Sequence, residues 1–335
     1  MNSMRAPAPS LRLHVVLTAL LAVTALASLG AGPVPLSPGD ILDGLGGGSS
    51  KAAIIIQEIR LPRLLLAALV GAGLAASGAA LQGLIRNPLA DPGVTGISSS
   101  AALGAVIAIY FGVGSFSPAL VPVMAFAGAF AAALVLVLIA AREASTLTLI
   151  LAGVAISSLA VALTSLALGL APNPYALAEF VNWLLGSLKN RSMDDVVLAA
   201  PVILAGIVLL FLSARGLDAL TLGEETAATL GVRLVRLRVL VVTGTALCVG
   251  GAVAAAGGVG FVGLIVPHLI RPFAGHVPGR LVVPSAIGGA ALVIAADLVV
   301  RLAPTGSELM LGVVTALIGA PFFFWLLFAT RRLAP

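Results

Sequence analysis

The sequence contains ten long apolar runs, separated by arginines, prolines and glycine clusters, and these runs are the main indication of its fold class. A helix needs about 20 apolar residues to cross the hydrocarbon core of a bilayer. Two runs, the third and the eighth, are short, and the Gly257-Gly258 break beside the eighth could also be a kink in one long helix, so nine to eleven spans fit and ten is the preferred number. The predicted spans are Leu13–Ala31, Leu61–Ile85, Val94–Phe111, Leu120–Ala141, Leu147–Leu170, Val196–Ala214, Leu237–Ala256, Val259–Phe273, Val283–Leu302 and Leu309–Thr330.

Composition agrees with a membrane environment. Hydrophobic residues make up 60% of the chain and charged residues 9%, whereas soluble domains carry about 25% charged residues. So few charges cannot cover a water-exposed surface. The net charge of +5 comes from basic residues that stand mostly singly at the ends of apolar runs, without the basic clusters that bind nucleic acid. We therefore predict an all-α integral membrane protein forming a single domain, residues 1–335, and no nucleic-acid partner.

The first apolar run, Leu13–Ala31, has two interpretations. Ala25-Leu26-Ala27 resembles a signal-peptidase site, which would make the run a signal peptide. The run has roughly 19 residues, however, and the apolar core of a signal peptide has about 7–15. A retained first transmembrane helix is the favoured interpretation.

Orientation follows from the arginines and lysines, because cytoplasmic loops carry the excess of these residues. Ten alternating spans with the N-terminus inside place 12 of the 18 basic residues on the inner side and 6 on the outer side. Both termini are then cytoplasmic.

Two outer loops are long enough to carry structure of their own. Residues 32–59 contain a glycine-serine run at 46–50 that predicts a flexible turn. Residues 172–195 contain an amphipathic segment, Leu177–Leu188, which includes Trp183. Because tryptophan favours the membrane–water boundary, this segment is predicted to lie along the membrane surface.

The longest inner loop, about 215–238, contains a predicted helix. Thr221 and Glu224 have the spacing of a capping box, and Gly231 is a favoured residue just past a helix end, so a helix is expected over Leu222–Leu230. A cytosolic helix this short is marginal in water, and it needs a partner surface or the rest of the bundle. An ordinary capped connection is the alternative.

Catalytic signals are missing from the sequence. Neither of the two lysines, Lys51 and Lys189, follows a glycine, so there is no phosphate-binding Gly-Lys-Ser/Thr motif. One cysteine and three isolated histidines give no metal-ligand spacing. Asp297 and Arg301 are four residues apart, which predicts a mutually neutralising pair, although an intramembrane acid is also a candidate proton site.

Six motifs, in order along nearly the whole chain, closely resemble those of the FecCD-type permeases. These are membrane subunits of type II ABC importers for vitamin B12, ferric siderophores and haem. The motifs are Arg60-Leu61-Pro62-Arg63, Ala79–Gly83, Arg86–Pro92, Leu222–Glu225, Gly260–His268 and Glu308–Pro321.

The resemblance implies an assembly in the bacterial inner membrane. In it, two permease subunits, here a homodimer, surround a central pathway, two ABC ATPase subunits bind ATP and Mg²⁺ below, and a periplasmic binding protein delivers the substrate. The chain itself would be no enzyme and would hold no cofactor or metal. Ferric siderophore is slightly favoured as the substrate because that use is the commonest in the family, and haem and cobalamin remain open.

The resemblance also implies roles for individual residues. The inner-loop helix corresponds to the coupling element that docks on the ATPase, and outward-facing arginines meet acidic residues of the binding protein, with lipid headgroup anchoring as the alternative. Residues near the cytoplasmic constriction are expected to form the gate. ATPase docking is expected of Thr221, Gly223, Glu224, Glu225, Leu230 and Gly231; binding-protein docking of Arg60, Arg63 and Arg301; and gating of Asn87, Leu89, Ser145 and Thr146.

The rival to this interpretation is an ion-coupled secondary transporter, or a channel, that works without an ATPase. It would have to couple through Asp297, and the inner loop would be a mere connection. The scarcity of intramembrane acids disfavours it.

Overall fold

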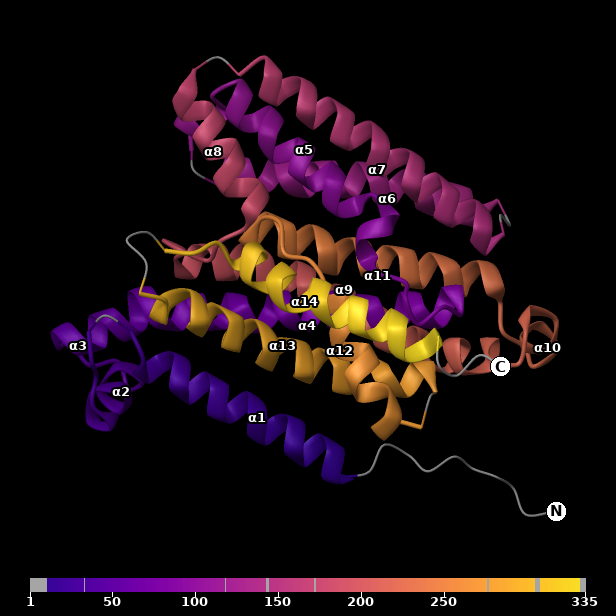
Figure 1. The fold of residues 1–335 in the computed structure, drawn as a ribbon, viewed down its shortest axis with the longest axis horizontal. Coiled ribbons are helices and arrows are strands. Elements are labelled where there is room, and N and C mark those ends of the chain that lie inside the picture. The colour runs from indigo at the N-terminus through magenta and orange to yellow at the C-terminus, as the bar shows by residue number, and fades with distance from the viewer. Residues whose placement is uncertain are drawn as a thin grey trace.

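The computed structural model describes residues 11–32, 34–117, 119–142, 145–171, 173–275, 277–304 and 308–331, and within them all regular secondary structure is helical. Its long helices run side by side, with α1 on one face, a group of α5 to α8 on the other, and the remaining helices between them (Figure 1). The α-helices are α1 Leu11–Gly30, α2 Pro38–Leu45, α3 Lys51–Ile54, α4 Leu61–Ile85, α5 Ile97–Tyr110, α6 Leu120–Ala141, α7 Thr146–Gly169, α8 Pro174–Leu185, α9 Met193–Leu220, α10 Glu224–Thr229, α11 Leu234–Ala256, α12 Val262–Ile270, α13 Pro278–Leu302 and α14 Leu311–Arg331.

The prediction of about ten spans is confirmed. Within the described residues, seven helices are long and apolar enough to cross a membrane, and three shorter apolar helices, α5, α12 with its 3-10 extension, and α14, complete the arrangement. The predicted bounds of α4 and α6 agree with the structure residue for residue.

Helix α4 is the centre of the bundle, and small residues let its neighbours approach. A Cβ atom on Gly71 would lie 2.1 Å from the carbonyl oxygen of Gly289 in α13, and one on Gly78 would lie 1.9 Å from that of Gly263 in α12. Such contacts suit helices in lipid, where close backbone packing replaces the hydrophobic drive between helices.

The eighth predicted span is only partly helical. The prediction of a helix over Val259–Phe273 is wrong in its first part, because residues 257–261 are non-helical and α12 begins at Val262. Nearby chain satisfies some of this backbone: Gly258 N–H donates to the carbonyl of Trp183 at 3.3 Å, and Ser187 N–H to that of Ala256 at 2.8 Å. Irregular backbone at membrane depth is tolerated where protein buries it in this way.

The first outer loop is more ordered than a flexible turn. Glycines 46–48 do form a turn, with Gly47 at φ 83°, but helices flank it. Ser37 caps α2 through a capping box with Asp40, and Ser50 caps α3. A π-helical turn, Ile55–Arg60, then leads directly into α4.

Helix α8 begins at Pro174, three residues before the amphipathic segment predicted from the sequence. Its residues Ala176 and Phe180 are buried in a cluster with residues of α5 such as Ala105, while Tyr175 stays 87% exposed. The apolar face of α8 therefore packs on protein, at the same end of the bundle as α2 and α3 (Figure 1).

Candidate docking and gating sites

The two ends of the bundle differ in charge. The start of α1 and the end of α14 lie at the end from which α10 protrudes (Figure 1). This end carries most of the arginines, including Arg215, Arg233 and Arg236. By the positive-inside rule it faces the cytoplasm, and we call it the inner end.

Helix α10 lies at the inner end within the predicted loop 215–238, but the predicted capping box is wrong. The hydroxyl of Thr221 donates to the carbonyl of Asp218 at 2.7 Å, so it closes the end of α9 instead of capping α10. Gly223, at φ 101°, is the residue before α10 and makes no side-chain cap. Gly231, at φ 87°, lies just past the helix in the left-handed conformation that glycine favours.

Glu224 holds α10 to the bundle. Both of its carboxylate oxygens accept hydrogen bonds from Nη2 of Arg238 in α11, each at 3.0 Å. The hydroxyl of Thr146, the first residue of α7, donates to the same carboxylate at 3.3 Å. Three elements therefore meet at one side chain, and a predicted docking residue contacts a predicted gate residue.

Two exposed leucines flank α10, Leu222 before its first residue and Leu230 directly after its last. Leu222 and Leu230 are 62% and 63% exposed, whereas Ala227 is buried against the bundle. Glu225 is exposed beside them. Exposed leucines at an aqueous helix are unfavourable unless another surface covers them.

The predicted gate residues lie on two neighbouring elements. Ser145 caps α7 by accepting from Thr148 N–H, and Thr146 contacts Glu224. Oδ1 of Asn87 accepts a hydrogen bond from the backbone N–H of Leu89 at 2.9 Å. This bond stabilises the turn after α4.

These two elements are joined by packing. The 3-10 turn Pro92–Thr95, which follows the Asn87 loop, packs on α7. A Cβ atom on Gly153 of α7 would lie 2.6 Å from the carbonyl of Val94. The turn that follows the Asn87 loop is therefore in direct contact with α7, about two helical turns from Thr146.

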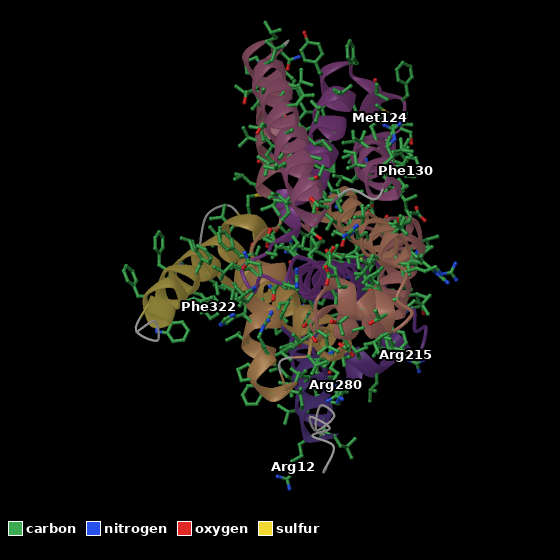
Figure 2. The ribbon with its side chains drawn as sticks, turned by 90° about the vertical axis from the view of Figure 1, so that its right-hand side faces the viewer. Arg12, Met124, Phe130, Arg215, Arg280 and Phe322 are labelled. Carbon is green, nitrogen blue, oxygen red and sulfur yellow. The ribbon has the colours of Figure 1, made fainter. Side chains whose placement is uncertain are left out.

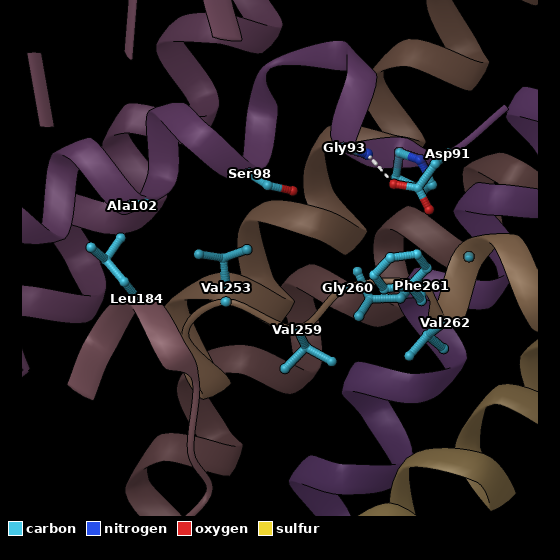
Figure 3. A pocket seen from close by; sticks show the side chains of 14 residues that line it. Asp91, Gly93, Ser98, Ala102, Leu184, Val253, Val259, Gly260, Phe261 and Val262 are labelled. Atoms are coloured by element: carbon cyan, nitrogen blue, oxygen red, sulfur yellow. Dashed lines mark hydrogen bonds between the residues drawn. The ribbon is translucent and has the colours of Figure 1, made fainter. Parts of the chain in front are cut away.

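A cavity of about 320 Å³ lies beside this turn (Figure 3). Its lining includes Asp91, Ser98 of α5 and the non-helical residues 258–261. Asp91 accepts the amide of Gly93 at 2.8 Å. Burial raises the pKa of the Asp91 carboxyl above its ordinary value, and the Gly93 hydrogen bond opposes that rise. The lining is mostly apolar, with few polar groups.

At the opposite, outer end, Arg60 is buried rather than displayed on a rim. It is 4% exposed. Its guanidinium donates to the carbonyls of Leu29, Gly30 and Val34, which follow or end α1. Arg60 thus fastens the end of α1 to the start of α4.

Arg63 and Arg301 join a buried ion network. Nε of Arg63 donates to both oxygens of Asp297, at 2.9 and 3.0 Å, and its Nη2 pairs with Glu308. Arg301 lies 3.2 Å from Asp297, as its four-residue spacing predicts, and also donates to Ser28 of α1. All three predicted docking arginines therefore have partners inside the chain, and their contact with a binding protein stays a prediction.

Sequence reasoning missed several partners. Arg238 and Glu308 carry no local signal of their contacts, which join residues 14 and 245 positions apart. A contact between Arg271 and Gln82, which ties α4 to the end of α12, was also missed, although Gln82 belongs to a quoted motif. Among the described residues, no group of three His, Cys, Asp or Glu side chains could hold a metal ion.

Comparison with known proteins agrees with this architecture. The model of the FecCD transport family matches residues 20–329. The cobalamin import system permease protein BtuC of Halobacterium salinarum is 43% identical over 282 residues, which cover 82% of this chain and 74% of that protein. The vitamin B12 import system permease protein BtuC of Salmonella paratyphi A is 38% identical over 317 residues, 94% of each chain.

A solved structure has the same fold. It is an inward-facing metal-chelate-type ABC transporter, 34% identical in sequence, and superposes with a TM-score of 0.85 over 95% of this chain and 99% of that one. The family match, the identities and the ten-span architecture lead to one conclusion: this chain belongs to the FecCD transport family and is a multi-pass inner-membrane permease of an ABC importer, not itself an enzyme.

Proposed function

We propose that this chain forms the translocation pathway of a cobalamin-class metal-chelate importer, driven by two separate ATPase subunits that dock on α10. The observation that carries the docking proposal is the pair of exposed leucines, Leu222 and Leu230, that flank a helix protruding from the inner end. An ATPase surface that covers them removes apolar area from water, which is favourable. ATP and Mg²⁺ belong to that partner.

Glu224 is proposed to transmit the movement of the docked helix. Its carboxylate contacts Arg238 of α11 and Thr146 at the start of α7. A shift of α10 would change both contacts at once and would reach the Asn87–Asp91 loop through α7. Gating by Asn87, Leu89, Ser145 and Thr146 is the corresponding proposal.

The substrate proposal rests on the relatives. Proteins 43% and 38% identical to this chain are named as cobalamin and vitamin B12 import permeases, and the similar solved structure is described as metal-chelate type. A corrinoid is therefore preferred here over a ferric siderophore or haem.

A second copy of the chain is proposed to complete the pathway. Helix α7 is long enough to span the membrane, yet only 17% of its most apolar window is buried. On α14, Leu317, Phe324 and Trp325 are more than 60% exposed. A homodimer in which these two helices face the central axis would cover both surfaces.

Delivery from a periplasmic binding protein is proposed at the outer end. Contact through Arg60, Arg63 and Arg301 requires that these guanidiniums exchange their present partners, Asp297 and Glu308 among them, for acidic groups of the binding protein. Removal of one internal competitor, by Glu308→Gln, should then strengthen capture of the cognate binding protein by the reconstituted permease. Weaker or unchanged capture would count against docking through Arg63.

The docking proposal is tested by reconstitution of the full chain with its ATPase in vesicles. Leu222→Ala with Leu230→Ala should lower substrate-stimulated ATP hydrolysis and uptake by about tenfold, since a desolvated contact of this size is worth roughly 1–3 kcal/mol. Leu204→Ala, a 51% exposed leucine on α9 away from α10, is the control and should leave both activities unchanged. Equal loss in the control would remove the evidence for docking.

The substrate class is tested by uptake of labelled cobalamin, ferric siderophore and haem into the same vesicles with ATP inside. Cobalamin uptake that depends on the ATPase and the binding protein is the expected result. Uptake that follows an ion gradient without the ATPase would instead support the secondary-transporter alternative and direct attention to Asp297.

A further inference from the structure

A groove of about 580 Å³ opens at the inner end of the bundle, and its lining includes none of the proposed docking or gate residues. Its floor is the start of α13, and α1 and α9 form its two walls, because both helices pack on α13. In Figure 2, which looks onto the inner end, Arg215 and Arg280 lie on the same side of the molecule as α1. Its lining includes Phe211, Leu212, Arg215, Asp218, Arg280 and Val283.

The rim of the groove is basic. Arg215 of α9 is exposed, and Arg280 at the start of α13 is half-buried. Asp218 is the carboxylate in the lining, and its Oδ1 accepts the amide of Gly279 at 2.6 Å. Arg280 also attracts this carboxylate. Two guanidiniums against one carboxylate leave a net positive rim, with His14 on the α1 wall beside it.

The walls of the groove are apolar and point toward the bilayer. Phe211, Leu212 and Val283 are 56%, 62% and 38% exposed. Each lies three or four residues, about one helical turn, from an arginine of the rim, on the side of the membrane interior. The groove therefore has a cationic end at the cytoplasmic boundary and a hydrocarbon-compatible end below it.

We propose that this groove binds an anionic phospholipid of the inner leaflet, with its phosphate headgroup between Arg215 and Arg280 and its acyl chains along Phe211, Leu212 and Val283. Basic pockets between helices on the cytoplasmic side are suited to such headgroups. Guanidinium also forms bidentate hydrogen bonds to phosphate. A zwitterionic lipid would lack the net charge that the rim complements, and free phosphate would leave the apolar walls without a partner. The bound lipid would fill the space between α1 and α9.

The first test counts bound lipids by native mass spectrometry of the full chain, with phosphatidylglycerol or phosphatidylcholine added. The unmodified chain should retain phosphatidylglycerol preferentially. Arg215→Gln should weaken that binding roughly fivefold, and Arg215→Gln with Arg280→Gln further, because each arginine near an anionic headgroup contributes about this factor. Arg12→Gln is the matched control, since Arg12 is an exposed arginine at the same end that does not line the groove.

The second test keeps both arginines and so does not depend on variants that remove charge. Phe211→Trp places a fluorophore on the wall, and vesicles contain a small fraction of brominated phosphatidylglycerol or brominated phosphatidylcholine. The added tryptophan should be quenched at a lower fraction of the anionic lipid. Exposed Trp325 of the unmodified chain should not distinguish the two lipids.

Three outcomes would overturn the proposal. They are equal binding of both lipids, an equal loss in Arg12→Gln, and protection of the added tryptophan from both brominated lipids. The last result would mean that a second copy of the chain or another protein covers the groove.

Discussion

The outer and inner ends of this bundle use charged residues in opposite ways. At the outer end, Arg63, Asp297 and Arg301 are buried in a network that joins α1, α4, α13 and the segment before α14. At the inner end, a single ion pair between Arg238 and Glu224 holds α10, and the Glu224 side chain is 37% exposed. Buried paired charges are costly to disturb, whereas a partly solvated pair can be exchanged. The outer network therefore holds the transmembrane helices in fixed positions, whereas the inner ion pair allows α10 to move when a partner binds.

The largest effect is expected from removal of the central carboxylate of the outer network. Asp297→Ala leaves Arg63 and Arg301 buried with only Glu308 to compensate them. Breaking one side of a buried pair costs about 3–5 kcal/mol. The variant should unfold at a much lower temperature in detergent, as measured by thermal aggregation of the purified chain.

Asp194→Asn is the control for this experiment, because Asp194 is an exposed acid at the start of α9. It should melt like the unmodified chain. A melting temperature of Asp297→Ala close to that of the control would remove the contrast between the two ends.

An intermediate effect is expected at the inner end. A double-mutant cycle of Glu224→Gln and Arg238→Gln should give an interaction energy of about 1 kcal/mol, since one partner is well solvated. The single variants should fold, but lose the coupling between ATP hydrolysis and uptake. An interaction energy as large as the effect of Asp297→Ala would mean that α10 is as firmly fixed as the outer end.

The smallest effect is expected at the edge of the outer network. Lys189 lies 3.9 Å from Glu308 and its side chain is 57% exposed. Lys189→Ala should change the free energy of unfolding by less than about 0.5 kcal/mol, as for other exposed pairs. A large loss would show that the outer network extends to the surface, and the distinction drawn between buried and solvated pairs would then need revision.

Hydropathy was enough to predict most of the fold, because lipid imposes a simple constraint on length and polarity. The bounds of α4 and α6 agree residue for residue for this reason. The start of α12 was misplaced because hydropathy counts Val259 and Phe261 as helical, although the sequence does show a break at Gly257-Gly258. What makes residues 257–261 irregular is their packing against the ends of α8 and α11.

The candidate sites were predictable as segments, not as contacts. Gly231 correctly marked the end of α10, because helix-end signals are local, whereas the predicted capping box between Thr221 and Glu224 does not form. The true partner of Glu224 is Arg238, one helix further on, and Arg63 meets Glu308 across 245 positions. Ion pairs between residues so far apart in the sequence depend on how the helices pack, and no local sequence pattern predicts them.

The π-helical turn Ile55–Arg60 makes the orientation of the preceding outer loop sensitive to the deletion of a single residue. A π-turn accommodates one residue more than the α-helix around it, so deletion of a single residue here would give an uninterrupted α-helix from α3 into α4. Everything before the deletion would rotate by about 100° around the helix axis. Gln57, which now donates to the carbonyls of Gly44 and Gly48 at 2.8 and 3.1 Å, would turn away from α2. The orientation of the first outer loop relative to the bundle thus depends on one extra residue. Homologues that lack this residue are expected to hold the same loop at a different angle.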